Sequence, residues 1–386
     1  MPEIRQDGEA RRGLSNAYIT STGAFLPGPP IGNEEIEEVL GCVEGKPSRL
    51  KARILKSNGI QTRHFAIDRS QQTTHSNAQM AVAAAKQCLD ASPVPAGSIG
   101  MLSCATTQGD MVVPGFGSMV QAGLGIPAVE LLTAHGICSS SVMAIKGAAN
   151  SLRLGEHRSA LVVVSELASR LLKSSRYEAA GGFEAIDFNS EFLRWMLSDG
   201  AGAWLLERAP RGRCLRIDWI RTFSHADAFP VCMGIGAPAD NADLRTWQDY
   251  ATYAEAEAAG ALLIRQDVRL LEQMVKLGVD GALRLIEEGV LNMEDVDHFL
   301  CHYSSHHFKG KIADLLEMSG ASIPQEKWFT NLYTRGNTGA ASILIMLDEF
   351  LREGRAKAGD RILCMVPESG RFNTAYMHFT VTEPQS

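Results

Sequence analysis

The sequence predicts an α/β protein in which helices cover both faces of a parallel sheet. Residues 99–107 and 159–167 are almost wholly apolar, and strands without polar–apolar alternation are typical of sheets buried on both sides. Helical segments of about ten to fifteen residues separate such strands, as in repeated βαβ units. The 386 residues are too many for one small core. This length predicts two domains, or one body built from two similar halves.

Hydrophobic periodicity and glycine punctuation define the first set of elements. A strand expected at 16–27 is followed by a short helix that Gly41 ends. The later elements are a helix at 76–92, a strand at 99–107, a helix at 115–125, a strand at 128–135, a helix after Cys138, a strand at 159–167 and a turn and strand at 195–207. The pattern blurs between residues 170 and 194. Residues 208–258 are irregular and rich in Asp, Ala and Pro, which predicts loops.

The alternation of helices and strands resumes with a long amphipathic segment. The expected elements are helices at 263–289, 307–320 and 336–354 and strands at 295–305, 360–367 and 373–383. The helices at 138–155 and 336–354 form a faint internal repeat, because each is rich in Ala, Ser and Gly, ends at a glycine and precedes a buried strand. Superposition of the copies places Cys138 opposite Asn337, both at helix N-termini. The repeat predicts a duplicated fold with these two residues near its centre.

Composition and charge exclude several classes of protein. With 45% hydrophobic and 21% charged residues, the composition is that of a globular protein. A net charge of −7 and the lack of a basic stripe argue against a nucleic-acid partner. No apolar run is long enough to predict a membrane-spanning helix. The polar N-terminus lacks the features of a signal or transit peptide. The eight cysteines are scattered without a C-x-x-C pair, which predicts reduced thiols in a cytoplasmic protein.

Cys138 lies between a short loop and a helix. A helix N-terminus presents unpaired N–H groups and partial positive charge, which favour a thiolate and can stabilise an oxyanion. The small side chains of Ser139 to Ser141 leave room for a substrate. By residue type alone, a cysteine in an apolar setting is most often an inert core residue. The sharp turn, the serine-rich helix start and the repeat favour a nucleophile instead.

Three histidines follow one apolar strand, in the run "FLCHYSSHHF". His302 falls at the end of the strand, where α/β folds place catalytic groups, whereas His306 and His307 begin the next helix. Each of them taken alone is equally well explained as a surface or capping histidine. Because no paired carboxylate accompanies them, we predict no metal site.

Two other turns carry polar groups. Asn337, in "TRGNTGAAS", is either an N-cap or a neutral donor whose amide points into a pocket. Ser369 and Gly370 follow a strand in "MVPESGRFN", and the N–H groups of such a turn can complete an oxyanion hole, although a plain loop has the same pattern. The glycines at 115–125 lack the third glycine of a dinucleotide fingerprint, which argues against NAD binding.

These motifs resemble the thiolase superfamily and, more narrowly, the β-ketoacyl-acyl carrier protein synthase III group of condensing enzymes. The segments that carry the likeness, in the family's order, are "NGIQTRHFA", "ATT…VP", the cysteine turn, "SDGAGAWLLE", "DHFLCH" and "GNTGAASI". The resemblance implies a five-layered αβαβα fold made of two pseudo-repeated halves, usually a homodimer. We expect these thiolase-like halves at 1–208 and 259–386, with an irregular insertion or connecting loops at 209–258.

The resemblance also implies a chemistry. Cys138 would take an acyl group from acyl-CoA, with the oxyanion against its own N–H and one N–H of Ser369 or Gly370. A malonyl thioester on an acyl carrier protein would lose CO₂ while His302 and Asn337 stabilise the enolate, giving a 3-oxoacyl product of fatty-acid or polyketide type. No cofactor is implied beyond the CoA thioester substrate.

Departures from the family's pattern concern the substrates. The oxyanion turn is usually a run of glycines, whereas here it is "PESG". At the position of Val113 the family commonly has a Phe that shapes the acyl pocket across the dimer. The smaller valine predicts room for a longer or branched acyl chain. Arg53 and Ser57 stand where the family has a Trp and an Arg that hold CoA, so Arg53 and the neighbouring Lys56 are only candidate CoA contacts.

Lys309 and Lys311 lie on the helix after His302 and are candidate contacts of an acidic carrier protein, although a solvated basic face has the same composition. Two alternative functions use the same cysteine. An acyltransferase would pass the acyl group to a hydroxyl or amine without decarboxylation, with His302 as general base. A ring-forming condensing enzyme of secondary metabolism would join two β-keto or unsaturated acyl units. A non-catalytic partner subunit fits poorly with intact Cys138, His302 and Asn337.

Overall fold

The computed structural model describes residues 15–184, 186–239 and 245–383, and it consists of two halves with the same strand order. The first half contains β1 (Tyr18–Phe25), β4 (Met101–Thr106), β5 (Glu130–His135), β6 (Ser159–Glu166) and β7 (Gly200–Glu207). The second half contains β8 (Cys214–Ser224), β11 (His298–Cys301), β12 (Trp328–Phe329), β13 (Arg361–Glu368) and β14 (Asn373–Thr382). The first set runs β5-β4-β6-β7-β1 across its sheet and the second runs β12-β11-β13-β14-β8. This matching order confirms the internal repeat.

The sheet is mixed, so the expected parallel arrangement holds for three strands of each half and not for the others. The strands β4, β5 and β6 are parallel, as are β11, β12 and β13, whereas β7, β1, β14 and β8 pair antiparallel with their neighbours. The two halves join edge to edge through β1 and β8, at the pairs Tyr18–Arg216 and Ile19–Leu215. Because this junction is short, each half behaves as its own layer.

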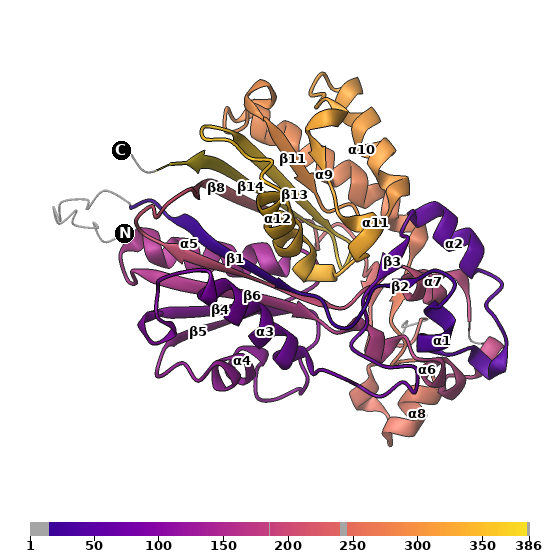
Figure 1. Ribbon diagram of the computed structural model, residues 1–386. Helices are drawn as coiled ribbons and strands as arrows, with labels where there is room; N and C mark the ends of the chain where they lie inside the picture. The colour runs from indigo at the N-terminus through magenta and orange to yellow at the C-terminus, as the bar shows by residue number, and fades with distance from the viewer. Residues whose placement is uncertain (1–14, 185, 240–244, 384–386) are drawn as a thin grey trace, which may run out of the picture.

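Helices separate and cover the two layers of strands (Figure 1). On the outer face of the first half lie α3 (Asn77–Asp90) and α4 (Phe116–Leu124), and on that of the second lie α9 (Leu271–Glu287) and α10 (His306–Met318). Between the layers lie α5 (Ser140–Leu154) and α12 (Ser342–Arg352). The helix α5 contacts β4 and β6 on one side and β8 and β14 on the other, so the five-layered αβαβα arrangement implied by the family resemblance is confirmed.

Small residues allow the central helices to approach the strands closely. A Cβ atom built on Gly202 of β7 would lie 2.5 Å from Cβ of Leu344 in α12, closer than two carbon atoms can approach. The first turns of α5 are likewise built from serine, and Ser140 and Ser141 are buried there. Because these side chains are small, the start of α5 and the loop before α12 can lie next to each other.

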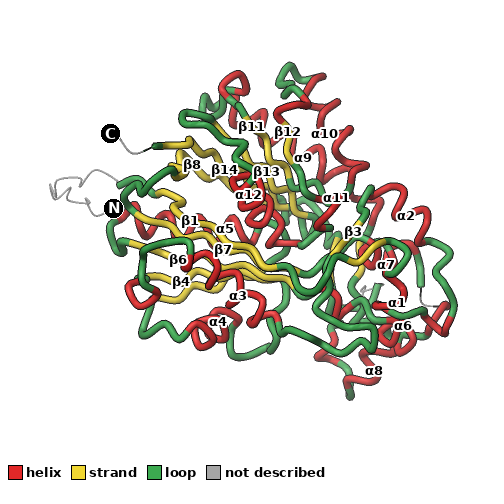
Figure 2. The backbone as a smooth tube through the Cα atoms, viewed as in Figure 1, coloured by secondary structure: helices red, strands yellow, loops and turns green. Residues whose placement is uncertain are grey.

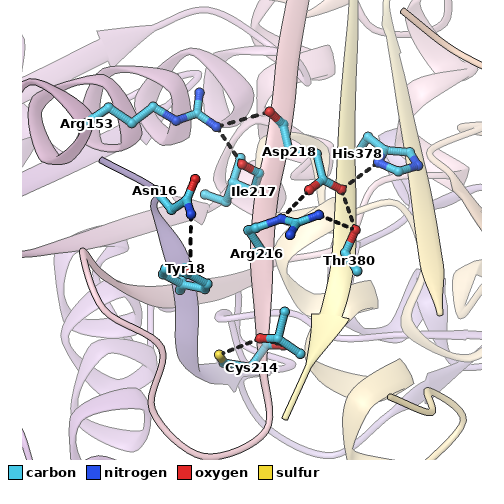
Figure 3. A network of polar contacts seen from close by, with 10 residues as sticks. Asn16, Tyr18, Arg153, Cys214, Arg216, Ile217, Asp218, His378 and Thr380 are labelled. Carbon is cyan, nitrogen blue, oxygen red and sulfur yellow. Dashed lines mark hydrogen bonds and ion pairs between the residues drawn. The ribbon is translucent and has the colours of Figure 1, made fainter. Parts of the chain in front are cut away.

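Polar contacts bind the far ends of the two halves together. Arg153, near the end of α5, donates hydrogen bonds to the backbone carbonyls of Ile217 and Asp218 in β8, at 2.5 and 3.3 Å. The carboxylate of Asp218 in turn accepts from His378 and Thr380 of β14 (Figure 3). This network lies at the end of the strands opposite the loops that contain Cys138 and His302.

The segment 209–258 is not an irregular insertion as expected. It contains the eleven-residue β8, which is the first strand of the second half, so that half begins well before residue 259. Between β8 and α9 the described chain forms β9 (Met233–Gly234), α8 (Tyr253–Ala258), β10 (Arg265–Gln266) and two 3₁₀ turns, at Trp247–Asp249 and Val268–Leu270, while residues 240–244 lie outside the described part. The long helix expected from residue 263 begins only at Leu271, because residues 265–266 pair with β9.

Short elements gather at one end of the layered body, to the right in Figure 1 and Figure 2, away from both chain ends. They are β2 (Ile31–Gly32), α1 (Ile36–Leu40), α2 (Lys51–Asn58), β3 (Thr62–Arg63), α6 (Ser174–Ala179), α7 (Phe188–Glu191) and α8, with α11 (Leu332–Arg335) beside them. Together with β9 and β10 they cover the ends of the central strands. In the described residues, no helix is both long enough and apolar enough to cross a bilayer.

Candidate active site

One cavity brings together the residues that the sequence singled out. Cys138, His302, Asn337 and Ser369 all line it, although they come from four separate loops. Cys138 lies between β5 and α5, His302 follows β11, and Asn337 lies between α11 and α12. Ser369 lies in the turn between β13 and β14. The central position predicted by the repeat is therefore confirmed for Cys138 and Asn337.

The rest of the wall is mainly apolar. Its apolar side chains come from β9, from the helix α9 and from turns and connections near the short elements, and they are Leu171, Leu193, Met196, Met233, Ile264 and Met274. Flexible methionine and leucine side chains suit an alkyl chain, because they adapt to an apolar ligand without losing hydrogen bonds. In the described part of the wall there is no lysine or arginine.

A buried carboxylate occupies the helix N-terminus beside Cys138. Glu368 Oε2 accepts hydrogen bonds from the N–H and the hydroxyl of Ser139, while its Oε1 accepts from Asn373. Burial, together with the negative charges of Glu368 and Glu166, raises the pKa of the Cys138 thiol well above its usual value. The expectation that the helix start favours the thiolate is therefore wrong, because burial of the thiol, followed by the nearby charge of Glu368, raises its pKa despite the positive end of the helix dipole.

Glu166 adds a second buried carboxyl group to the cavity wall. It ends β6, and its Oε1 accepts from the N–H and hydroxyl of Thr107 at 2.9 and 2.8 Å. Burial raises the pKa of Glu166 to about 8, so the group holds a proton at neutral pH. A Cβ atom on Gly339 would lie 3.1 Å from its Cγ, which shows how closely Glu166 packs under the loop that follows Asn337.

His302 is a neutral, enclosed imidazole. Burial lowers its pKa to about 4, and its Nε2 is buried without a hydrogen-bond partner among the described residues. The backbone of His302 is fixed beside β13. Its N–H donates to the carbonyl of Met365, and the preceding residue, Cys301, pairs with Met365 in the sheet. A buried nitrogen without a partner, facing a cavity, is a group available to a ligand.

Asn337 is fixed by its own backbone and by the next turn. Its N–H donates to the carbonyl of Met196 and its carbonyl accepts from the N–H of Ser198, at 3.2 and 2.8 Å. Its side-chain Oδ1 accepts from the N–H of Gly339 at 3.0 Å. That hydrogen bond leaves the NH₂ group as the free end of the amide. A short 3₁₀ turn at Gly339–Ala341 separates Asn337 from α12, so the residue precedes the helix rather than starting it.

The turn after β13 passes close to the residue that precedes Cys138. A Cβ atom on Gly370 would lie 2.9 Å from the side chain of Ile137, so a larger residue would push the turn away from Cys138. Ser369 lines the cavity and its hydroxyl donates to Gln266 at 3.1 Å. The expected neighbours of an oxyanion hole are therefore close together, although Gly370 itself does not line the cavity.

Several predicted site residues lie elsewhere. Val113 is on the surface, with 75% of its area exposed, in the loop before α4. Arg53 and Lys56 are exposed on α2, and Arg53 lies over the ring of Phe188. None of these lines the cavity of the single chain.

The predicted carrier contacts are also remote from the cavity. Lys309 lies over the ring of Trp328, and Lys311 forms an ion pair with Glu272. The helix α10 packs against α2, so these lysines lie on a helix that adjoins the one with Arg53 and Lys56. His306 is exposed, and its Nδ1 is 2.6 Å from the hydroxyl of Tyr333. Of the histidines in "HYSSHH", only His302 lines the cavity.

Sequence reasoning missed three residues of the site. Glu166 follows an apolar strand, the same signal that identified His302, and this position could have found it. Glu368 stands in the quoted turn as a departure from the family, but nothing local shows that it reaches Ser139. Gln266 was included in an expected helix, and no signal in the sequence marks it.

Comparisons with known proteins agree with this fold. The family model for the 3-oxoacyl-[acyl-carrier-protein] synthase III C terminal matches residues 286–371. A β-ketoacyl-[acyl-carrier-protein] synthase III of Hyphomonas neptunium is 26% identical over 90% of this chain and 94% of its own length.

Two solved structures share the fold. The 3-oxoacyl-[acyl-carrier-protein] synthase III of Aquifex aeolicus has a TM-score of 0.71 and 23% identity, with 94% of this chain and 99% of that chain covered. AbyA1, a tetronic acid condensing enzyme, has a TM-score of 0.75 and 21% identity with the same coverage. The match in the C-terminal part of the chain, the similar full-length relative and the shared fold together support a resemblance to β-ketoacyl-acyl carrier protein synthase III and related condensing enzymes of the thiolase superfamily.

Proposed function

We propose that the protein joins two acyl thioesters by Claisen condensation, with Cys138 carrying the first acyl group. The observation that supports this function is the meeting of Cys138 with His302 and Asn337, from the two halves, around one mainly apolar cavity. A nucleophile and two neutral donors suit carbon–carbon bond formation through an enolate. Donors without charge stabilise the developing oxyanion, whereas a fixed carboxylate in their place would repel it.

In the proposed first step, Cys138 Sγ attacks the carbonyl carbon of an acyl-CoA. The new C–S bond forms, the bond to CoA breaks, and the thiol proton of Cys138 passes to the departing CoA sulfur. The Cys138 N–H and an N–H of the Ser369–Gly370 turn would hold the carbonyl oxygen while it is negative. The raised pKa of Cys138 means that the proton leaves with the attack, not before it.

In the proposed second step, a malonyl thioester on an acyl carrier protein loses CO₂. Its carbonyl oxygen accepts hydrogen bonds from His302 Nε2–H and the Asn337 amide, which stabilise the enolate. The enolate carbon attacks the acyl carbonyl, the bond to Cys138 breaks, and the Cys138 thiolate takes a proton from water. The product is a 3-oxoacyl thioester. The low pKa of His302 suits this role, because the imidazole stays neutral.

The charges around the cavity favour a second candidate donor. Glu368 places a negative charge beside Cys138, while the described cavity wall holds no lysine or arginine to pair with a malonyl carboxylate. A neutral β-keto or unsaturated acyl thioester avoids this repulsion. In that ring-forming alternative the donor's α-carbon loses a proton to His302 Nε2 instead of losing CO₂.

The proposed partners use the outer surface. Arg53 and Lys56 would contact CoA phosphates, and Lys309 and Lys311 an acidic carrier protein, since both pairs lie on adjoining helices. We propose a homodimer as the working form, in which the exposed loop around Val113 reaches the acyl pocket of the second copy. No cofactor takes part in the proposed steps.

Mass spectrometry of the intact protein tests the function. Wild-type protein incubated with a panel of acyl-CoA thioesters should gain one acyl group, and Cys138→Ala should gain none. Cys364→Ala, which removes another fully buried thiol, should load normally. Malonyl-acyl carrier protein is then added to the loaded enzyme, and released CO₂ is trapped.

Loss of the adduct with formation of a 3-oxoacyl product and CO₂ supports the decarboxylating reaction. Consumption of a β-ketoacyl thioester without CO₂ supports the neutral donor. An adduct that persists in Cys138→Ala overturns the proposed role of this cysteine.

A further inference from the structure

The turn that contains Ser369 and Gly370 is held from outside its own hairpin. Cys232 and Met233, at the start of β9, both donate their N–H groups to the carbonyl of Gly370, at 2.9 and 3.2 Å. The hydroxyl of Ser369 donates to Oε1 of Gln266 in β10, at 3.1 Å. Both partners of the turn therefore come from one small antiparallel pair, β9 and β10, which we call the β9–β10 clamp.

Gln266 closes this arrangement into a ring of hydrogen bonds. Its Nε2 donates to the carbonyl of Cys232 at 3.4 Å and lies 2.9 Å from the Cys232 sulfur. The N–H of Asp267 donates to the same carbonyl at 2.7 Å, which ties the two short strands together. The side-chain amide thus reaches from the clamp to the turn with one end on each.

The ring is shielded from water. Gln266 is 2% exposed, Cys232 3% and Ser369 8%. A buried hydroxyl that loses its partner bears the cost of desolvation, and among the described residues the Ser369 hydroxyl has besides Gln266 only a contact of 3.9 Å to the sulfur of Met233. A buried glutamine among apolar residues is also uncommon unless its amide is used.

We propose that Gln266 is a positioning residue that fixes the Ser369–Gly370 turn at the distance needed to stabilise an oxyanion. This inference rests on the proposed function, in which the turn supplies an N–H to the acyl carbonyl oxygen. Such stabilisation depends on donors held in place before the reaction, because reorientation during the reaction would remove the gain. Gln266 also lines the cavity, as Met233 does. The residue that supports the turn, which we call its brace, is therefore also part of the wall that would face the acyl chain.

The test compares Gln266→Met, which keeps length and apolar volume, with Ser369→Ala and with both changes together. The control is Tyr376→Phe, which removes a buried hydrogen bond to Gly278 on the outer side of the same half. We expect Gln266→Met to slow single-turnover acyl loading about ten-fold while the KM for acyl-CoA stays unchanged. The double variant should be no slower than Gln266→Met, since both substitutions break the same brace. Tyr376→Phe should load at the wild-type rate.

Hydrogen exchange of the segment 368–372 provides a measurement that needs no turnover. We expect faster exchange there in Gln266→Met than in wild type or Tyr376→Phe, with equal melting temperatures in the two variants within a few degrees. Normal loading by Gln266→Met, or unchanged exchange in the turn, overturns the inference. Faster exchange in a wild-type-like fold that never accepts an acyl group confirms the brace and overturns the proposed function instead.

Discussion

Glu368 and Ser139 meet at the start of α5, where one carboxylate oxygen accepts from both the N–H and the hydroxyl of the serine, at 2.9 and 2.6 Å. This contact satisfies donors that a helix N-terminus otherwise leaves free. It also places a negative charge beside Cys138, and burial with that charge raises the pKa of the thiol. The raised pKa favours the protonated thiol of Cys138 over a resting thiolate.

Neutralising Glu368 should make Cys138 more reactive toward alkylating agents. Gln at this position keeps an acceptor for Ser139 but removes the charge, so the pKa of Cys138 falls. We expect iodoacetamide to modify Cys138 about three- to ten-fold faster at pH 8 in Glu368→Gln, since each pKa unit changes the thiolate fraction ten-fold. Peptide mapping after timed quenching measures the rate. Glu207→Gln, a buried glutamate of β7 outside the cavity wall, should alkylate like the wild type, and an unchanged rate in Glu368→Gln would contradict the charge effect.

Glu166 should make the protein less stable as the pH rises. Its pKa is raised to about 8 in the folded state and is near 4.5 when unfolded, so its stabilising contribution is complete below about 4.5 and is lost as the pH rises through 8. Between pH 6 and 8 the free energy of unfolding should fall by about 2 kcal/mol more in wild type than in Glu166→Gln. Urea unfolding at both pH values measures the difference. Parallel curves for the two proteins would show that Glu166 is ionised in the folded state.

His302 and Asn337 should act after the acyl group is loaded. We expect His302→Ala and Asn337→Ala to keep the acyl adduct on Cys138 but to lower condensation about 10²- to 10³-fold, the usual effect of losing one donor to an oxyanion. Single-turnover product formation from the loaded enzyme measures this step. His306→Ala is the matched control, because His306 lies on the surface with Tyr333. Loss of condensation in that control alone would mean that the wrong histidine was chosen.

Val113 tests the proposed dimer. A Val113→Phe substitution should leave the free energy of unfolding within about 0.5 kcal/mol, because the side chain is 75% exposed in the single chain. We nevertheless expect the variant to prefer shorter acyl-CoA substrates, since the larger ring would enter the pocket of the second copy. Loading rates across a chain-length series measure the preference. The same profile in both proteins would show that this loop does not line the pocket.

The central layer should tolerate no extra volume at β7. Gly202→Ala would place a methyl group 2.5 Å from Cβ of Leu344, and we expect a loss of about 1–3 kcal/mol in the free energy of unfolding. Gly310→Ala is the matched control, because a Cβ atom there meets nothing within 4 Å and alanine favours the helix α10. Denaturation curves of both variants measure the contrast. A stable Gly202→Ala would mean that α12 can shift without cost.

The sequence by itself determined the repeated architecture and the loops that meet at its centre. Apolar runs and helical periods are local signals, and they located most of the central strands and helices, including the strand before His302 and the helix after Cys138. They failed for β8, whose buried, half-buried and exposed residues follow no regular alternation and whose sequence has no long apolar run. They also failed at residues 263–270, where helical periodicity extends into a segment that pairs with β9.

Only the tertiary structure decided the electrostatics and support of the site. Ser139 and Glu368 are 229 residues apart in the chain, and Gln266 and Ser369 are 103 apart. Periodicity and motifs describe neighbours in sequence, whereas the pKa of Cys138 depends on charges and burial supplied by other loops after folding. The sequence could therefore identify the cysteine, the histidine and the asparagine, but the protonation states of these groups follow from which distant side chains fold against them.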